Sequence, residues 1–413
     1  MGNNTIAVVG GAYGEECSYP RNKVAYRGSG GRASTFLSCI GVETIFHTIL
    51  SESLLPKFKR ISKTYGFSLQ YQSKDSDIWF RYRHPLSKPN IYHQSLTTSK
   101  LEKIDANFAL VFGMLEGRPQ VTAKKVVYDP QNGSNSEHFE DNNSTAEELA
   151  LLVSLSEGQA LTNQVIPEEI AKSLIARKHV SVVIIKCGPQ GALVKTKNEE
   201  EWIKPFVTNK VYKIGSGDIF SAAFAYSWLI KGFCPFTAAW FASKATATYV
   251  ESGTDLFEIE TIEKLEINAA KDRLSFKGLK ARDIPNTQIY LAGPFFDTSE
   301  QWLIDEAREA LTEMGFKVFS PIHDIGTGSP NEVASQDLFA LEKSGVVFAL
   351  LDGMDPGTVF EVGYARALGI PVIAVAETSH EKDLTMILGS GCEVANDFTT
   401  GIYATCWYLM GDV

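Results

Sequence analysis

The sequence has no cysteine pairs, no long apolar runs and no excess of positive charge, and each lack excludes a class of protein. Its six cysteines stand singly and without metal-ligand spacing, which argues against a disulfide framework and a zinc site. No apolar stretch approaches the roughly 20 residues that span a bilayer, and the N-terminus shows no signal-peptide pattern. The net charge of −10 argues against a nucleic-acid backbone as partner. We therefore expect a cytoplasmic protein with neither a membrane nor a nucleic acid as partner.

The length and the order of the predicted elements indicate two α/β domains. At 413 residues, two domains of ordinary size are the expectation, and 44% hydrophobic with 21% charged residues is typical of a globular protein. Strand and helix patterns alternate in both halves, which predicts Rossmann-like parallel sheets covered by helices. A charged stretch without a strong apolar face separates the halves. We predict domains at residues 1–267 and 287–413, with a linker at 268–286.

The first domain combines this alternation with two local features. Its predicted strands include 108–112, 125–129 and 181–186, and a helix is predicted at 145–155. Short strands at 68–72, 77–83 and 90–94, joined by polar turns, predict a small β-flap that is either a lid or a surface hairpin. The glycine-rich residues 28–31 precede a helix predicted at 33–40. Glycines there would let a ligand approach the helix amides, although such a stretch is also compatible with a simple turn.

The strongest signal in this domain is Gly-Ser-Gly-Asp at residues 215–218, followed by an apolar helix predicted at 219–230. Small residues let successive amides point at one spot, and a helix N-terminus adds positive potential there. Such a site would stabilise the charge on a transferring phosphoryl group. Asp218 would take the proton of an acceptor hydroxyl. The alternative is that Asp218 only caps the helix.

These motifs resemble the ribokinase-like (PfkB) family of sugar and nucleoside kinases over about residues 5–255. The resemblance implies ATP and Mg²⁺ as cofactors, a nucleoside or pentose as substrate, and lid elements near 12–30 and 68–98. It makes Asp218 the base. It assigns the anion hole to Gly215, Ser216 and Gly217, the nucleotide site to Lys186, Gly188 and Gly191, the indirect ordering of Mg²⁺ to Glu157, and the acceptor site to Gly30, Gly31 and Arg32.

The acceptor end departs from the family pattern. No Asp follows the first strand, where residues 11–16 read Gly-Ala-Tyr-Gly-Glu-Glu. Arg32 stands where the family usually has Asn, Tyr212-Lys213 replaces an Asp-Thr pair, and Ser154 replaces an Asn of the metal site. Two hypotheses follow. The domain phosphorylates an altered acceptor, or it is a non-catalytic nucleotide sensor that regulates the second domain.

The second domain is centred on residues 352–361, Asp-Gly-Met-Asp-Pro-Gly-Thr-Val-Phe-Glu. A strand predicted at 345–351 leads into this acidic loop, and a helix predicted at 362–368 follows it. Open α/β sheets place ligands at such strand ends. We place Glu361 in the first helical turn, where the helix dipole favours the ionised carboxylate, which can attack a sugar carbon. The alternative is that Thr358 and Glu361 form a capping box.

Three motifs resemble the nucleoside 2-deoxyribosyltransferase family, which includes N-glycoside hydrolases. They are Tyr-Leu-Ala-Gly-Pro-Phe-Phe from Tyr290, Asp337 in a predicted helix, and Asp-Pro-Gly-Thr-x-x-Glu from Asp355 to Glu361. The resemblance makes Glu361 a nucleophile that forms a covalent glycosyl ester and Tyr290 the residue that orients it. Asp337 and Asp355 would protonate the leaving base or contact the sugar, with their roles undivided.

The remaining pocket residues follow from the same resemblance. Phe295 and Phe296 would pack on the base, or belong to an ordinary core. A neighbouring subunit would complete the pocket with residues 384–387, so we expect a homo-oligomer without a cofactor in this domain. The loop at 293–297 has no cation, which favours uncharged 2'-deoxynucleosides, while transfer to a second base and hydrolysis both stay open. The substrate-binding positions are thus Gly293, Phe295, Phe296, Gly357, Thr385 and Met386.

Overall fold

The computed structural model describes residues 4–20, 22–93, 102–131, 135–275 and 284–411. The chain forms two compact units. The first comprises Met1–Thr208 and Tyr212–Ala281, and the second Asn209–Val211 and Arg282–Val413. None of the described helices is both long and apolar enough to cross a membrane.

The first unit is built on a nine-stranded sheet whose order is β13-β12-β11-β10-β9-β8-β1-β4-β5. The strands from β11 to β5 are parallel, while β12 and β13 add an antiparallel edge. This arrangement confirms the predicted parallel α/β sheet. The strand bounds are β1 (Thr5–Val9), β4 (Glu43–Ser51), β5 (Ser68–Lys74), β8 (Ile104–Phe112), β9 (Val121–Asp129), β10 (Thr145–Ser154), β11 (Val180–Lys186), β12 (Ala192–Thr196) and β13 (Glu200–Ile203).

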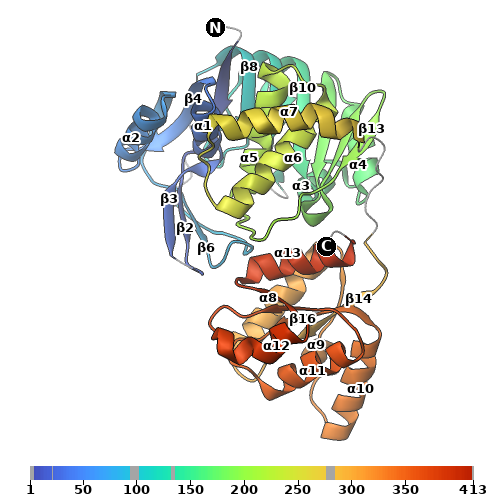
Figure 1. The fold of residues 1–413 in the computed structure, drawn as a ribbon. Coiled ribbons are helices and arrows are strands. Elements are labelled where there is room, and N and C mark those ends of the chain that lie inside the picture. Colours follow the sequence, from blue (N-terminus) through green and yellow to red (C-terminus); the bar gives the residue numbers. More distant parts are fainter. Residues whose placement is uncertain (1–3, 21, 94–101, 132–134, 276–283, 412–413) are drawn as a thin grey trace. The chain divides into compact units, whose positions relative to one another are not determined.

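Helices cover this sheet, and most of the buried side chains between the layers are apolar. Figure 1 shows α1, α5, α6 and α7 on one face of the sheet. On the other face, the core joins Ile170, Ala171 and Leu174 of α4 to Val183 and Ile185 of β11. The helix bounds are α1 (Gly28–Cys39), α2 (Leu55–Tyr65), α3 (Leu155–Thr162), α4 (Pro167–Ile175), α5 (Ser216–Ala225) with a π-helical turn (Tyr226–Ile230), α6 (Pro235–Ser252) and α7 (Ile259–Ser275).

A separate four-stranded sheet forms the predicted flap, in the order β3-β2-β6-β7. Its strands are β2 (Gly14–Cys17), β3 (Lys23–Tyr26), β6 (Trp79–Tyr82) and β7 (Asn90–Tyr92). The strand predicted at 68–72 is not part of it, because β5 pairs with β4 at the edge of the large sheet. The flap therefore combines two segments that are far apart in the sequence.

Three further predictions in this unit were wrong in detail. The segment predicted as a helix at 145–155 is strand β10, whose buried second half is a continuous apolar run, Leu149 to Val153. Such a run in a sheet covered on both faces cannot be told from a buried helix by its period. The helix predicted from residue 33 begins at Gly28. Helix α7 runs through Ser275, so the predicted linker begins as helix at residues 268–275.

The second unit has a five-stranded, all-parallel sheet in the order β15-β14-β16-β17-β18. Its strands are β14 (Gln288–Ala292), β15 (Lys317–Phe319), β16 (Ser344–Leu350), β17 (Val372–Val375) and β18 (Glu393–Ala395). The helices are α8 (Thr298–Glu313), α9 (Pro321–Asp324), α10 (Pro330–Glu342), α11 (Pro356–Ala367), α12 (Thr385–Gly389) and α13 (Phe398–Leu409).

Candidate functional site

In the second unit, the structure brings together the tyrosine and the glutamate that the sequence singled out. Tyr290 lies in the interior strand β14 and is fully buried. Its hydroxyl donates a hydrogen bond to Oε1 of Glu361 at 2.6 Å, across 71 residues of sequence. The Tyr290 ring stacks on Phe319 of β15, with 5.6 Å between the ring centroids. The strand and the ring packing therefore hold the hydroxyl that contacts the carboxyl.

The start of α11 excludes the capping-box alternative for Glu361. The N-cap is Asp355, whose Oδ2 accepts the backbone N–H of Thr358 at 2.7 Å and its hydroxyl at 2.9 Å. Because the helix begins at Pro356, Glu361 lies in the second turn and not in the first, as the sequence had suggested. Its carboxyl therefore does not cap the backbone N–H groups at the start of α11. It also lies beyond the first turn, where the effect of the helix dipole is largest.

Burial, rather than the helix dipole, controls the protonation of this site. It raises the pKa of Glu361 to about 7, an effect that Asp337 and Asp355 reinforce and the Tyr290 hydroxyl opposes. Burial also raises the pKa of Asp337 to about 6. Asp337 Oδ1 is buried without a hydrogen-bond partner among the described residues. Two carboxyls that titrate near neutrality can supply one ionised and one protonated group at the same pH.

At the start of α8, two carboxylates, those of Asp297 and Glu300, accept hydrogen bonds from backbone N–H groups. Asp297 Oδ1 accepts the N–H groups of Ser299 and Glu300 at 2.8 and 2.9 Å. Glu300 Oε2 accepts those of Phe296 and Asp297 at 2.8 and 3.2 Å. A helix N-terminus is a common site for phosphate, but these amides are already taken by carboxylates.

The other predicted pocket residues of the second unit range from closely packed to largely exposed. Phe296 is 74% exposed and stands 5.1 Å, centroid to centroid, from the ring of Phe295, so it is not an ordinary core residue. Gly293 is packed so closely that a Cβ would lie 2.8 Å from Ile304. A Cβ on Gly357 would lie 3.1 Å from the capping Asp355. At the start of α12, Thr385 is exposed and Met386 is 79% exposed.

In the first unit, the residues of the predicted anion hole open helix α5. Gly215 precedes it with φ of 82°, a conformation that favours glycine, and no side chain caps the helix. The capping alternative for Asp218 is therefore wrong. Its Oδ2 instead accepts a hydrogen bond from Arg32 Nη1 at 2.6 Å, and its Oδ1 accepts one from Gln131 Nε2 at 2.6 Å.

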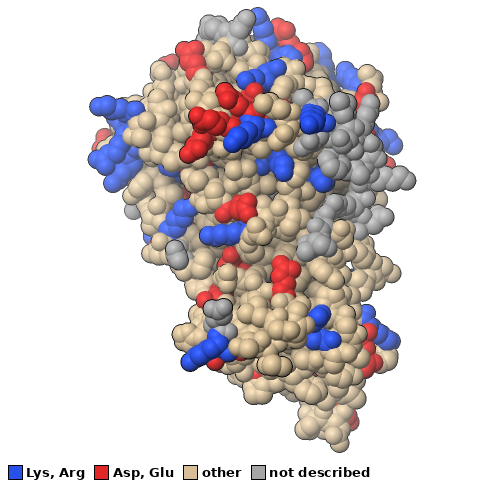
Figure 2. Space-filling view, in the orientation of Figure 1, with Lys and Arg blue, Asp and Glu red and all other residues tan. Residues whose placement is uncertain are grey.

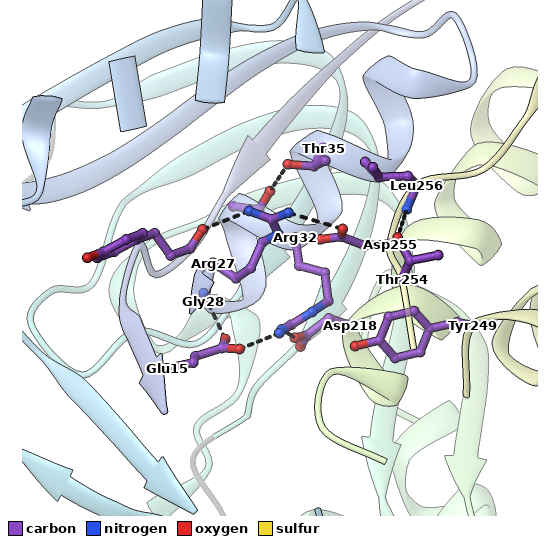
Figure 3. Close-up of polar contacts among 12 residues, drawn as sticks. Glu15, Arg27, Gly28, Arg32, Thr35, Asp218, Tyr249, Thr254, Asp255 and Leu256 are labelled. Atoms are coloured by element: carbon purple, nitrogen blue, oxygen red, sulfur yellow. Dashed lines mark hydrogen bonds and ion pairs between the residues drawn. The ribbon is translucent and has the colours of Figure 1, made fainter. Parts of the chain in front are cut away.

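Arg32 is the centre of a buried ion-pair network (Figure 3). It extends from α1, is 4% exposed, and also pairs through Nη2 with Glu15 of the flap strand β2. Glu15 Oε1 accepts the backbone N–H of Gly28 at 2.9 Å. Burial works against the charge of Arg32, but nearby Glu15, Tyr249 and Asp218 outweigh it and raise its pKa. The predicted glycines Gly30 and Gly31 lie within α1, where their missing side chains make room for Phe46 and Phe58.

A second, partly buried ion pair lies beside the predicted anion hole. Lys186, at the end of β11, donates to Asp129 Oδ2 at 2.6 Å, and so does the Ser221 hydroxyl of α5 at 2.6 Å. A Cβ on Gly217 would lie 3.7 Å from Lys186 Nζ. Burial opposes the charge of Lys186, but Asp129 and Glu157 outweigh it and raise its pKa. The ammonium is thus placed to meet an anion at the start of α5.

Two further predicted positions surround this pair. Gly188 and Gly191 form the turn after β11 with φ of 56° and 97°. A Cβ on Gly191 would lie 2.1 Å from the Ile203 carbonyl, so only glycine fits there. Glu157 is engaged by the start of α3, where its Oε2 accepts the Ser154 N–H at 2.6 Å.

The carboxylates near the anion hole do not fit a magnesium ion held by the protein. Asp129 is paired with Lys186, Asp218 with Arg32, and Glu157 with the start of α3. Among the described residues, no cluster of three or more His, Cys, Asp or Glu side chains could hold a metal. We therefore assign no step to Mg²⁺.

Comparisons with known proteins match each unit to a family. Residues 122–255 match the model of the pfkB family carbohydrate kinases, and residues 289–398 match that of the nucleoside 2-deoxyribosyltransferases. The chain joins a pfkB-family, ribokinase-like domain to a nucleoside 2-deoxyribosyltransferase-family domain. No curated protein matches the sequence.

The ribokinase-like domain also has similar solved structures. Aminoimidazole riboside kinase from Salmonella enterica, solved with its riboside and an ATP analogue, is 14% identical, with a TM-score of 0.52, and covers 64% of this chain and all (100%) of its own. Ribokinase from Thermotoga maritima is 17% identical, with a TM-score of 0.48. The match covers 64% of this chain and 99% of the Thermotoga chain. At such identity the likeness shows the fold alone.

Two residues of the ribokinase-like site were missed by the sequence analysis. Gln131 follows β9 with φ of 50° and holds Asp218, although nothing in its sequence context marks it. Glu15 lies in the stretch that was noted only for lacking an Asp. A carboxylate that close after the first strand, together with an Arg in place of Asn, was the signal that could have paired it with Arg32.

Proposed function

We propose that the deoxyribosyltransferase-family domain cleaves the N-glycosidic bond of a 2'-deoxynucleoside through a covalent ester on Glu361. The observation that carries the proposal is the 2.6 Å bond from the buried Tyr290 hydroxyl to the Glu361 carboxyl. An oxygen of Glu361 attacks the anomeric carbon as the bond to the base nitrogen breaks. A second base or a water molecule then attacks the same carbon and frees the carboxylate. Tyr290 keeps the nucleophile in one orientation throughout.

We assign the proton donor to Asp337 and a positioning role to Asp355. A leaving base departs more easily when protonated, and a carboxyl with a pKa of about 6 still carries its proton in part of the molecules near neutrality. The unpartnered, buried Oδ1 of Asp337 is available for this contact within the described part of the chain. Asp355 is engaged by Thr358 at the start of α11, which leaves it to place the helix and to contact sugar hydroxyls.

The substrate in this proposal is an uncharged nucleoside. At the start of α8, the carboxylates of Glu300 and Asp297 occupy the backbone N–H groups that a 5'-phosphate would need as donors. These negative charges would also repel the phosphate. The test is chromatography of products from 2'-deoxynucleosides and their monophosphates, with and without a second base. Base release from the nucleosides supports the proposal, and a new nucleoside in the mixture identifies transfer. Release from monophosphates alone would contradict the assigned substrate.

Base release will follow a bell-shaped pH profile with limbs near pH 6 and pH 7. The nucleophile Glu361, with a pKa of about 7, must be ionised, and the donor Asp337, with a pKa of about 6, must be protonated. Activity is therefore lost in acid as Glu361 gains a proton and in alkali as Asp337 loses one. The limbs belong to the pair rather than to either residue. The measurement is kcat/KM from pH 4.5 to 9.

A Tyr290→Phe variant provides the control for this profile. The Tyr290 hydroxyl lowers the pKa of Glu361, so its removal raises that pKa, by about one unit for a hydrogen bond to a charged group. The profile should broaden towards alkaline pH and lose height. An unchanged profile would show that the hydroxyl does not act on the nucleophile.

We also propose that copies of this domain associate through exposed apolar side chains on α10, α11 and α12. Phe339, Phe360 and Met386 are 58%, 60% and 79% exposed, one on each helix. Figure 2 shows few charged side chains on the face of this unit that is in view. Such apolar exposure is typical of a protein interface.

A Met386→Asp variant will be smaller in solution and at least about tenfold less active, because a charge in a buried interface weakens association by more than 1.4 kcal/mol. Light scattering after size-exclusion chromatography gives the mass, and base release the activity. Val165→Asp is the control, since Val165 is 72% exposed in the ribokinase-like domain. A monomeric wild-type protein with full activity would contradict the proposal.

For the ribokinase-like domain we propose ATP as the ligand of the anion hole at Gly215–Gly217. The glycine turns, the start of α5 and the Lys186 ammonium support an anion at this place. Phosphorylation of a nucleoside or pentose is the first candidate activity. Nucleotide sensing without transfer is the second, and the pairing of Asp218 with Arg32 favours it. ADP release with nucleosides and pentoses separates the two.

A cytoplasmic location is part of the proposal, in line with the free cysteines.

A further inference from the structure

The acceptor side of Asp218 is filled by charged side chains of the protein itself. Figure 3 shows the Arg32 guanidinium between Glu15 and Asp218. Arg32 Nη1 donates to one oxygen of Asp218 at 2.6 Å, and Gln131 donates to the other oxygen at 2.6 Å. Both oxygens of the base assigned to phosphoryl transfer therefore already accept hydrogen bonds from buried or half-buried donors.

Three elements hold Arg32 in this place. It extends from α1, it pairs with Asp218 of α5, and it pairs with Glu15 of the flap strand β2. Glu15 is in turn 8% exposed and bonded to the Gly28 N–H. A Cβ on Gly215 would lie 2.3 Å from Arg32 Nε, so the guanidinium packs directly on the first residue of the anion hole.

This position is the one that an acceptor hydroxyl needs. In the transfer, the hydroxyl gives its proton to Asp218 while its oxygen bonds to the γ-phosphorus of ATP. The bond from that phosphorus to the bridging oxygen breaks, and ADP leaves. The hydroxyl must therefore approach Asp218 to about 3 Å on the side that faces the anion hole. Arg32 Nη1 occupies that side at hydrogen-bond distance.

We propose that Arg32 is an internal plug that takes the place of the acceptor on Asp218, so that the domain binds ATP without phosphorylating a nucleoside or pentose. Glu15 holds the plug and ties it to the flap. The inference rests on the proposed ATP site, and it gives the nucleotide-sensing candidate a cause in one residue. Removal of the plug should expose the base to an acceptor.

The test compares ATP binding with ADP release in the full chain. The variants are Arg32→Asn, the double variant Glu15→Gln/Arg32→Asn and the control Arg27→Asn. In the single variant, the buried Glu15 carboxylate loses its cationic partner, which can destabilise the fold. The double variant also removes the Glu15 charge and so avoids this loss of stability. Arg27 is a matched control because it forms a partly buried ion pair with Asp255 and has no hydrogen bond to Asp218. Calorimetry with ATP measures binding, and a panel of nucleosides and pentoses supplies the acceptor.

We expect the wild type and Arg27→Asn to bind ATP without acceptor-dependent ADP release. Both plug variants should bind ATP and release ADP about 100-fold faster with an acceptor, the usual contribution of a general base. The proposal is overturned if the wild type turns over and loss of Arg32 slows it, because Arg32 is then part of the working site. The proposal is also overturned if the folded double variant binds ATP but shows no acceptor-dependent ADP release. Failure of the wild type to bind ATP would instead refute the proposed ATP site.

Discussion

A Glu361→Gln variant will release base at least about 1,000-fold more slowly than the wild type, a loss of about 4 kcal/mol of transition-state stabilisation. Glutamine keeps the size of the side chain and can still contact the Tyr290 hydroxyl, but it has no carboxylate to bond to the anomeric carbon. Chromatography of the released base measures the effect. Glu342→Gln is the control, because Glu342 also accepts a tyrosine hydroxyl, that of Tyr364 at 2.6 Å, yet lies at the surface.

Two further measurements separate lost chemistry from lost folding. A slow fluorinated deoxynucleoside should leave its sugar on the peptide that spans residues 356–366, as read by mass spectrometry. An unlabelled peptide from protein that still releases base would end the covalent assignment.

Burial raises the pKa of Glu361 from its usual 4.5 to about 7, so the wild type loses stability as pH rises through this window. The variant escapes this loss and should gain up to about 3 kcal/mol relative to the wild type between pH 4.5 and pH 8.

A Lys186→Met variant will destabilise the ribokinase-like domain by about 3–5 kcal/mol and abolish ATP binding. Asp129 is completely buried, and loss of the ammonium at 2.6 Å leaves it with the Ser221 hydroxyl as its remaining hydrogen-bond donor among the described residues. Hydrogen exchange of peptides from β9 and β11 reads the stability of this domain separately from the other.

A double-mutant cycle tests the origin of this effect. The variant Asp129→Asn/Lys186→Met removes both charges and should recover most of the stability but not ATP binding. Lys195→Met on the neighbouring strand β12 is the matched control, since Lys195 pairs with Glu200 at 2.8 Å in a more exposed setting and should change stability by less than about 1 kcal/mol. Equal losses for the two lysine variants would show that burial of the Asp129 pair has no special weight.

The sequence by itself determined the two families, the order of their motifs and the chemical types at each site. Gly215 to Asp218 and Asp355 to Glu361 are short stretches in which the chain enters a helix. Backbone requirements of this kind are local, so glycines and carboxylates at fixed spacing predict them. The pairing of Tyr290 with Glu361 was expected only because the motifs resemble those of the nucleoside 2-deoxyribosyltransferase family.

Only the tertiary structure decided which groups these residues meet. Strand β10 was predicted as a helix because its buried half is an apolar run without strand alternation, and only its pairing with β9 and β11 shows it to be a strand. The helix dipole suggested an ionised Glu361, but burial by distant segments raises its pKa to about 7. Asp218 meets Arg32 across 186 residues, which no local pattern encodes. Burial and ion pairing depend on segments that are remote in sequence, so protonation and access at both sites became visible only in the folded chain.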